Sequence, residues 1–263
     1  MANECIGKIK LFSSKEIEKS RVSVGFECLD RELFNPEKCY DFLGRSGAKW
    51  ARCQTGWNRC EKEKGVYTFE WLDSIVDNLL ERGVQPWFNV GFGNPIYMPD
   101  ATNPTCVGWV PTLFGEEVKQ AWINYIHALA KHFKGRVRCY EIWNESDTKQ
   151  FWHPSEPNGK EYAQLVEITG KAIRDEIENC MIGANMAGVF RENGKGVYDR
   201  ISYLEDFAKG LKAGAIDFFA YHTYEFHTDT VNARSFEYVK KIMCDYGHTD
   251  IEYWNGESGH ASW

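Results

Sequence analysis

The sequence lacks the signatures of most metal, nucleotide and membrane proteins. Its nine cysteines include no Cys-x-x-Cys pair, which disfavours a zinc or thiol-redox site. No Gly-x-Gly-x-x-Gly motif or phosphate loop follows a predicted strand, which disfavours a nucleotide-binding open sheet. Because no run of about 18 apolar residues occurs, we expect no membrane-spanning helix. The composition therefore predicts neither a cofactor nor a metal, and no membrane partner.

Charge and the N-terminal residues exclude further classes. The net charge is -7 and no long Lys/Arg run occurs, so we expect no nucleic-acid partner. Met1–Cys5 shows no apolar stretch behind a basic region, as a signal peptide would. Reduced thiols in a cytoplasmic protein are the simplest interpretation of the scattered cysteines, with one or two disulfides as the alternative. The oligomeric state stays open.

The residues that are plentiful indicate one large domain. A length of 263 residues with 43% hydrophobic residues is sufficient for a sizeable core, and residues 1–263 are interpreted as a single catalytic domain. Aromatic residues make up 15% of the chain, including 10 tryptophans. Carbohydrate sites are often lined by such rings, because the flat faces of sugars stack on them, although large cores also use them.

Short apolar runs alternate with amphipathic stretches from about residue 20 to the end. Helical spacing of apolar residues predicts five helices, over Phe69–Glu81, Glu116–Phe133, Glu161–Glu178, Tyr203–Lys212 and Ser235–Tyr246. The runs between them predict seven strands, over Val22–Glu27, Ala48–Gln54, Gln85–Gly91, Arg138–Trp143, Met181–Met186, Ile216–Tyr224 and Ile251–Asn255.

Strict alternation of strands and helices is typical of a parallel sheet with helices outside it. The predicted fold is an α/β protein, a (β/α)8 TIM barrel truncated after the seventh strand, with the eighth β/α unit absent; a doubly wound open sheet is the competing fold. Gly7–Phe12 also has a strand-like pattern but precedes the first strand, so it does not supply a parallel eighth strand. The long loop from Gly93 to Phe114 follows the third strand, where barrel loops commonly build the active face.

Two glutamates end strands that would meet at one rim of such a barrel. Trp143-Asn144-Glu145 ends the fourth predicted strand, and Glu257 follows the seventh within Trp254–Gly259. Cleavage of a glycosidic bond needs two carboxyl groups across the bond, one to protonate the leaving oxygen and one to attack the anomeric carbon. Glu141 lies about 13 Å down its strand and is interpreted as a structural carboxylate.

The run Tyr140–Glu145 resembles the Asn-Glu signature of clan A glycoside hydrolases. In that clan the acid/base glutamate follows an asparagine at the end of strand four, and the nucleophilic glutamate ends strand seven. The resemblance extends from Val22 to Gly259. The stretch Gly65–Asp73 resembles family 39, the family of β-xylosidases and α-L-iduronidases.

This resemblance implies a retaining double displacement, with Glu145 as general acid/base and Glu257 as nucleophile. Carboxyl groups about 5–5.5 Å apart suit that mechanism, and Glu145 must be protonated while Glu257 is ionised. The resemblance also implies roles for residues around the pair: Arg52 and Tyr224 hydrogen-bond the nucleophile, Asn144 donates to the sugar 2-hydroxyl, and His222 points into the sugar subsite. The clan's tryptophan after strand eight has no counterpart.

Other residues are candidates by position or type alone. Asn89 ends the third predicted strand, where it could bind sugar. Trp57 and Trp87 either stack on sugar or fill space, and Trp57 is included among the predicted substrate-binding residues. A metal site at His222 and His227 is disfavoured, because no steady ligand spacing surrounds them.

The leading interpretation is therefore an exo-acting, β-xylosidase-like retaining glycosidase whose partner is an oligosaccharide or glycoside. The alternatives are an endo-acting glucanase or mannanase of the same clan, a non-catalytic carbohydrate-binding barrel or fragment, and a metal-dependent barrel hydrolase or isomerase. The residues do not decide the sugar.

Overall fold

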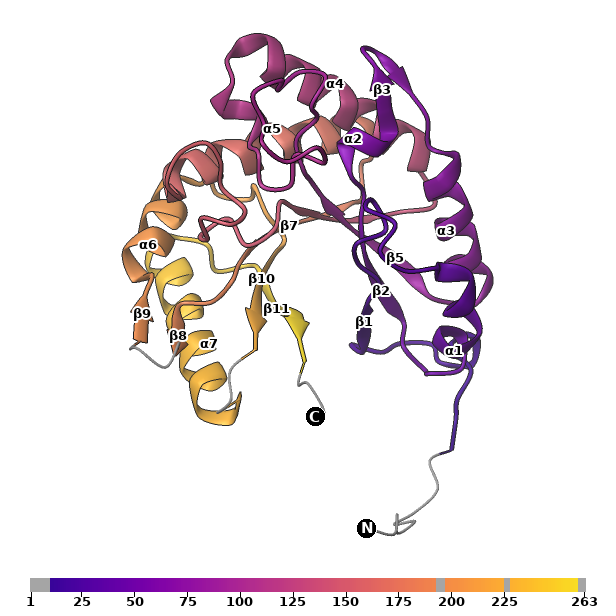
Figure 1. Cartoon of the computed structure of the whole chain (residues 1–263). Coiled ribbons are helices and arrows are strands. Elements are labelled where there is room, and N and C mark those ends of the chain that lie inside the picture. The colour runs from indigo at the N-terminus through magenta and orange to yellow at the C-terminus, as the bar shows by residue number, and fades with distance from the viewer. Residues whose placement is uncertain (1–9, 193–196, 225–227, 260–263) are drawn as a thin grey trace, which may run out of the picture.

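The computed structural model describes residues 10–192, 197–224 and 228–259. Seven parallel strands form one curved sheet, and their order in space is their order along the chain (Figure 1). The strands are β1 (Ser23–Gly25), β2 (Trp50–Gln54), β5 (Gln85–Val90), β6 (Cys139–Ile142), β7 (Met181–Met186), β10 (Phe218–Thr223) and β11 (Glu252–Ser258).

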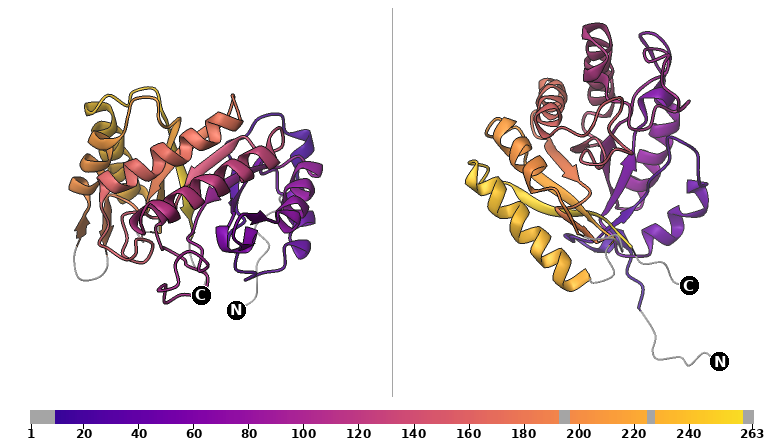
Figure 2. Two further views of the ribbon diagram at one scale, coloured as in Figure 1. Left: turned by 90° about the horizontal axis from the view of Figure 1, so that it is seen from above. Right: turned by 60° about the vertical axis from the view of Figure 1, so that its left-hand side comes forward.

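Helices connect successive strands and lie on the outer face of the sheet (Figure 2). The long ones are α3 (Glu70–Glu81), α4 (Glu116–Phe133), α5 (Gly159–Glu176), α6 (Ile201–Gly210) and α7 (Thr228–Asp245). The short helices are α1 (Tyr40–Gly44) and α2 (Trp57–Cys60), with 3-10 turns at Ser14–Glu16, Pro36–Lys38 and Pro111–Leu113. Among the described residues, no helix has the length and apolar character needed to cross a membrane.

Local sequence explains where the long helices form. In α3 the buried side chains Leu72, Ile75, Val76 and Leu79 recur at helical spacing and face the sheet. The helix stops at Gly83, whose φ of 76° suits glycine. At the start of α5, the Asn158 side chain accepts hydrogen bonds from two backbone N–H groups of the first turn.

The predicted alternation is confirmed, and the bounds differ by a few residues. The pattern analysis missed α1 and α2, which are only five and four residues long. It also missed two antiparallel hairpins, β3–β4 (Glu61–Glu63 and Val66–Tyr67) and β8–β9 (Phe190–Glu192 and Val197–Asp199). Elements this short show too few apolar repeats to be recognised. Residues 7–9 of the strand-like N-terminal run lie outside the described residues, and residues 10–12 form no strand.

The sheet is a (β/α)8 barrel that stops after the seventh strand, as predicted. Among the described residues, β1 pairs with β2 alone and β11 with β10 alone, so these two strands form the edges of the described sheet. The inner strands are almost fully buried, whereas β11 is largely exposed or half-buried along its length. Aromatic rings fill the interior between the strands, where Phe218 stacks on Trp254 with ring centroids 4.0 Å apart.

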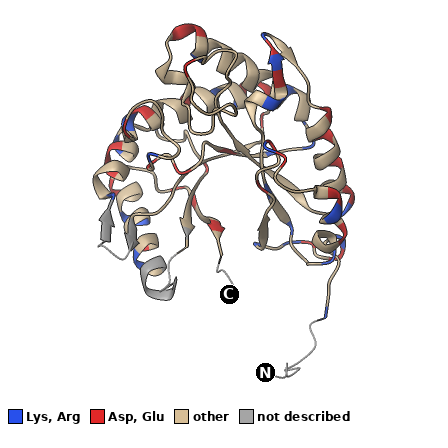
Figure 3. Cartoon of the chain, in the orientation of Figure 1, with Lys and Arg blue, Asp and Glu red and all other residues tan. Residues whose placement is uncertain are grey.

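Surface charge is mixed. Acidic and basic residues both occur along the outer faces of the helices (Figure 3). All eight cysteines among the described residues are free thiols, and four of them are buried. No disulfide therefore forms within the described part of the chain.

Candidate active site

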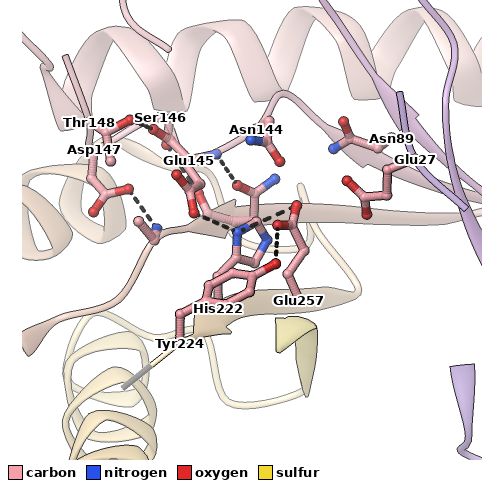
Figure 4. Close-up of polar contacts among 12 residues, drawn as sticks. Glu27, Asn89, Asn144, Glu145, Ser146, Asp147, Thr148, His222, Tyr224 and Glu257 are labelled. Carbon is pink, nitrogen blue, oxygen red and sulfur yellow. Dashed lines mark hydrogen bonds and ion pairs between the residues drawn. The ribbon is translucent and has the colours of Figure 1, made fainter. Parts of the chain in front are cut away.

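The carboxyl ends of the parallel strands bring together side chains that are far apart in the sequence (Figure 4). The segment after β6 carries Asn144 and Glu145, β10 carries His222, and β11 carries Glu257. Because parallel strands of a barrel end at one rim, residues at these ends face a common space. The structure therefore places both predicted catalytic glutamates in one site.

His222 lies between the two glutamates. Its Nδ1 is 3.0 Å from Glu145 Oε1 and 3.7 Å from Glu257 Oε1. One oxygen from each glutamate and one His222 nitrogen all lie within 4.8 Å of one another. Both glutamates are partly open to solvent, with side-chain exposures of 10% for Glu145 and 17% for Glu257. Each carboxyl group is thus partly accessible to solvent.

The backbone that carries Glu145 adopts an unusual conformation. Trp143 and Glu145 have φ values of 69° and 41°, in the left-handed region that residues other than glycine rarely occupy. Buried amides hold this turn: Asn89 and Asn185 both donate to the Trp143 carbonyl, at 2.5 and 2.7 Å, and Asn185 Oδ1 accepts from the Glu145 N–H at 2.7 Å. Asn89 is thus 1% exposed and bound to the backbone of this turn, rather than open to solvent.

Glu257 is held by side chains of two other strands. Arg52 Nη1 donates to its Oε1 at 2.6 Å, and the Tyr224 hydroxyl donates to its Oε2 at 2.9 Å. A register shift places His222 opposite Glu257, with Gly256 bulged out of the pairing. A Cβ at Gly256 would lie 3.0 Å from His222 Nε2, so a larger residue there would press on the His222 ring.

These contacts favour the charged form of Glu257. Burial alone would raise the pKa of its carboxyl, but the electrostatic interactions with His222 and Arg52 and the hydrogen bond from Tyr224 outweigh burial and lower that pKa. An ionised carboxylate is the form required of a nucleophile. In turn, burial and the negative charge of Glu257 raise the pKa of the Tyr224 hydroxyl, which stays a donor.

Arg52 is the centre of the network. Its Nε and Nη2 donate to the two oxygens of Glu141 at 2.9 and 2.8 Å, and Nη2 also donates to Asn144 Oδ1 at 2.9 Å. Arg52 and Glu141 are both fully buried, so each neutralises the other where water cannot. Glu141 is the structural carboxylate that its position on the strand predicts.

The structure does not bring Trp57 to this site. Its ring is fully buried, stacks between Tyr97 and Tyr125 at centroid distances of 5.2 and 5.8 Å, and donates its N–H to Glu61. The prediction that Trp57 binds substrate is therefore wrong, because a ring packed on both faces has none left for a sugar. Trp87 likewise fills the barrel interior against Phe218 and Trp254.

Sequence reasoning missed two residues of the site. Glu27 follows β1 and shares Arg52 with Glu257, accepting from Nη1 at 2.5 Å. The predicted strand Val22–Glu27 ends on this carboxyl group, so the strand-end argument used for Glu145 would have found it. Asn185 had no comparable signal, since its role depends on contacts with a turn 40 residues earlier.

The two glutamates and the histidine between them also resemble a set of metal ligands. Glu145, His222 and Glu257 offer three atoms of the kind that bind divalent metals, close enough together to share one ion. His227, the other predicted candidate ligand, lies outside the described residues. Three ligands are the number of a catalytic zinc site, but the two carboxyl groups among them are also the pair that a retaining glycosidase uses.

Sequence comparison decides the family. The family model for glycosyl hydrolases family 39 matches residues 50–252, well over half of the chain. The chain belongs to glycosyl hydrolases family 39. It is similar to a β-xylosidase from Geobacillus stearothermophilus, 28% identical over 46% of this chain and 24% of that protein, and to one from Caldicellulosiruptor saccharolyticus, 25% identical over 68% and 38%. The chain thus spans well under half the length of these relatives.

Solved structures confirm the fold of this family 39 chain. Xylanase 10B from Thermotoga petrophila RKU-1, in complex with xylobiose, has a TM-score of 0.60 at 13% identity, over 94% of this chain and 73% of that one. An endo-1,4-β-mannanase from Rhizomucor miehei has a TM-score of 0.59 at 12% identity, over 91% and 77%. At such low identity the likeness concerns the fold alone.

Proposed function

We propose that this chain carries the catalytic centre of a retaining glycoside hydrolase. The observation that supports it best is the placement of Glu145 and Glu257 on either side of His222, with oxygens within 4.8 Å of each other. Carboxyl groups of inverting glycosidases stand about 6.5–9.5 Å apart to admit a water molecule, whereas those of retaining enzymes are about 5–5.5 Å apart. The short separation favours double displacement.

In the first step, Glu257 attacks the anomeric carbon while Glu145 protonates the leaving oxygen. Arg52 and Tyr224 hold the two Glu257 oxygens, which leaves the carboxylate ionised and fixed in orientation. In the second step, Glu145 takes a proton from water, which then displaces Glu257 and releases the sugar with retained configuration. His222, at 3.0 Å from Glu145, fixes the position of the acid/base carboxyl.

For the substrate, we propose a β-xylosidase-like, exo-acting activity. The support is the name of both curated relatives, β-xylosidase, within the same family. An endo-acting xylanase or mannanase is the second candidate, supported only by barrels that share the fold.

The test is hydrolysis of a panel of aryl glycosides by the wild type, Glu145→Gln and Glu257→Gln, with Glu37→Gln as a surface control. We expect turnover of an aryl β-xyloside by the wild type and the control, lost in Glu257→Gln and severely reduced in Glu145→Gln. Turnover that survives both substitutions would contradict the assignment. Activity abolished by a chelator would instead favour the metal-dependent alternative, and sugar binding without turnover a non-catalytic barrel.

A further inference from the structure

A third carboxyl group stands in the site beside the two catalytic ones. Glu27 lies on the side of Glu257 away from Glu145 (Figure 4), and its side chain is 19% exposed. Arg52 Nη1 donates to both carboxyls, at 2.5 Å to Glu27 and 2.6 Å to Glu257. The Glu27 and Glu257 carboxyls are also close enough for each to shift the pKa of the other. Two acids that meet at one guanidinium nitrogen are well placed to share a proton.

The charge balance of this network is unfavourable unless a proton is present. Glu27, Glu141 and Glu257 all surround one buried cation, Arg52, and Glu141 alone occupies two of its hydrogen bonds. Three ionised carboxyls would leave excess negative charge in a site that is mostly shielded from water, which is costly. One of the three must therefore hold a proton near neutral pH.

Geometry places that proton on Glu27. Glu257 accepts hydrogen bonds from Arg52 and from the Tyr224 hydroxyl, and it lies 3.7 Å from His222 Nδ1. Glu27 has the hydrogen bond from Arg52. Burial raises the pKa of Glu27 to about 7, while that of Glu257 is lowered. The ionisable groups that interact electrostatically with Glu27 lie on its own loop, on β2, β6 and β11, and just after β10. They are Cys28, Arg52, Cys53, Glu141, Tyr224 and Glu257.

We propose that Glu27 is a positioning residue of the catalytic centre, which holds a proton between Arg52 and Glu257 and so keeps the nucleophile ionised and oriented. This inference rests on the proposed glycosidase activity. The protonated carboxyl donates to Glu257 and accepts from Arg52. Once Glu27 ionises, it becomes a second anion beside the nucleophile and competes with it for Arg52 Nη1. Activity then falls with rising pH.

The first measurement is the pH dependence of kcat and KM for the wild type, Glu27→Ala, Glu27→Gln and the surface control Glu37→Gln. A misplaced nucleophile costs about 100-fold in rate, so we expect Glu27→Ala to lower kcat by about that factor with little change in KM. Glutamine keeps a donor and an acceptor but cannot ionise. Because the glutamine amide still donates to the charged Glu257 carboxylate, kcat of Glu27→Gln should be at least about tenfold higher than that of Glu27→Ala. The alkaline limb of its kcat–pH profile should move to higher pH.

Two results would overturn the proposal. A raised KM with unchanged kcat in both variants would make Glu27 a sugar contact, and an equal loss in both with an unchanged pH profile would make its role structural. If Glu27→Ala does not fold, Glu27→Gln alone decides by its pH profile.

A second measurement is independent of turnover, so it separates failure of this inference from failure of the proposed activity. A carboxyl whose pKa is raised on folding stabilises the fold below its unfolded value and loses that contribution as pH rises through its folded value. The pKa of Glu27 rises on folding from its unfolded value of about 4.3. The urea concentration at the unfolding midpoint should therefore decrease as the pH is raised from about 5 to about 8 in the wild type and in Glu37→Gln. The decrease should be clearly smaller in Glu27→Gln. Parallel curves for all three proteins would contradict a proton on Glu27.

Discussion

The two glutamates proposed as catalytic are held in different ways. Glu145 follows an inner strand, β6, and buried backbone contacts from Asn89 and Asn185 fix the turn that carries it. Glu257 lies on the edge strand β11, whose outer side has no partner strand among the described residues. Side chains position it instead, above all Arg52, which extends from β2 and contacts residues from β1, β6 and β11.

This difference shows two ways in which the described strands position the proposed catalytic pair. Backbone pairing fixes a residue on an inner strand, because hydrogen bonds on both sides set its register. On an edge strand, a buried guanidinium with a planar set of donors supplies the missing constraint. Substitutions that remove contacts of Glu145 and substitutions that remove contacts of Glu257 should therefore have different effects on stability and activity.

Arg52→Met should have the largest effect, on both stability and activity. It leaves Glu141 as a buried acid without its cation, and breaking such a pair costs about 3–5 kcal/mol in the free energy of unfolding. Lys64→Met, which removes an exposed ion pair with Glu117, should cost no more than about 1 kcal/mol. Urea unfolding measures both. A loss for Arg52→Met no larger than that of the control would show that the buried network is dispensable.

Asn185→Ala tests the contacts that hold the turn carrying Glu145. It removes the acceptor of the Glu145 N–H and one donor to the Trp143 carbonyl, and a buried group left unsatisfied costs about 1–3 kcal/mol. Because the turn also positions the acid/base, kcat should fall together with the unfolding free energy. Asn78→Ala, on the exposed face of α3, is the matched control. Full activity with reduced stability would separate the turn from catalysis.

Tyr224→Phe tests the contacts of Glu257 on the edge strand β11, and it is the smallest structural change of the three. The ring is 50% exposed, so the free energy of unfolding should change by less than about 0.5 kcal/mol. The hydroxyl lowers the pKa of Glu257, so its loss should raise that pKa and move the acid limb of kcat to higher pH. Loss of a hydrogen bond to a charged group predicts a decrease of about tenfold in kcat. Tyr246→Phe is the control, and an acid limb that stays in place would exclude this role.

The sequence was sufficient to predict the strand alternation and most of the site. Residues at strand ends were found because the barrel fixes where a strand end lies, which is why Glu145, Asn144, Arg52, His222 and Glu257 meet as expected. The prediction for Trp57 failed because residue type alone does not show whether a side chain is buried. Trp57 begins a short helix that no pattern predicted. The contacts of Asn185 with the turn before Glu145 carry no signal in the sequence, whereas Glu27 could have been found from its place at a strand end.

The most direct test of the double displacement is to trap the intermediate. A 2-deoxy-2-fluoro xyloside with a good leaving group slows the second step more than departure of the leaving group, so the glycosyl-enzyme should accumulate and be visible by mass spectrometry. The account predicts one added sugar, on the peptide that contains Glu257, and none in Glu257→Gln. Hydrolysis with inverted configuration, or a label on another residue, would contradict it.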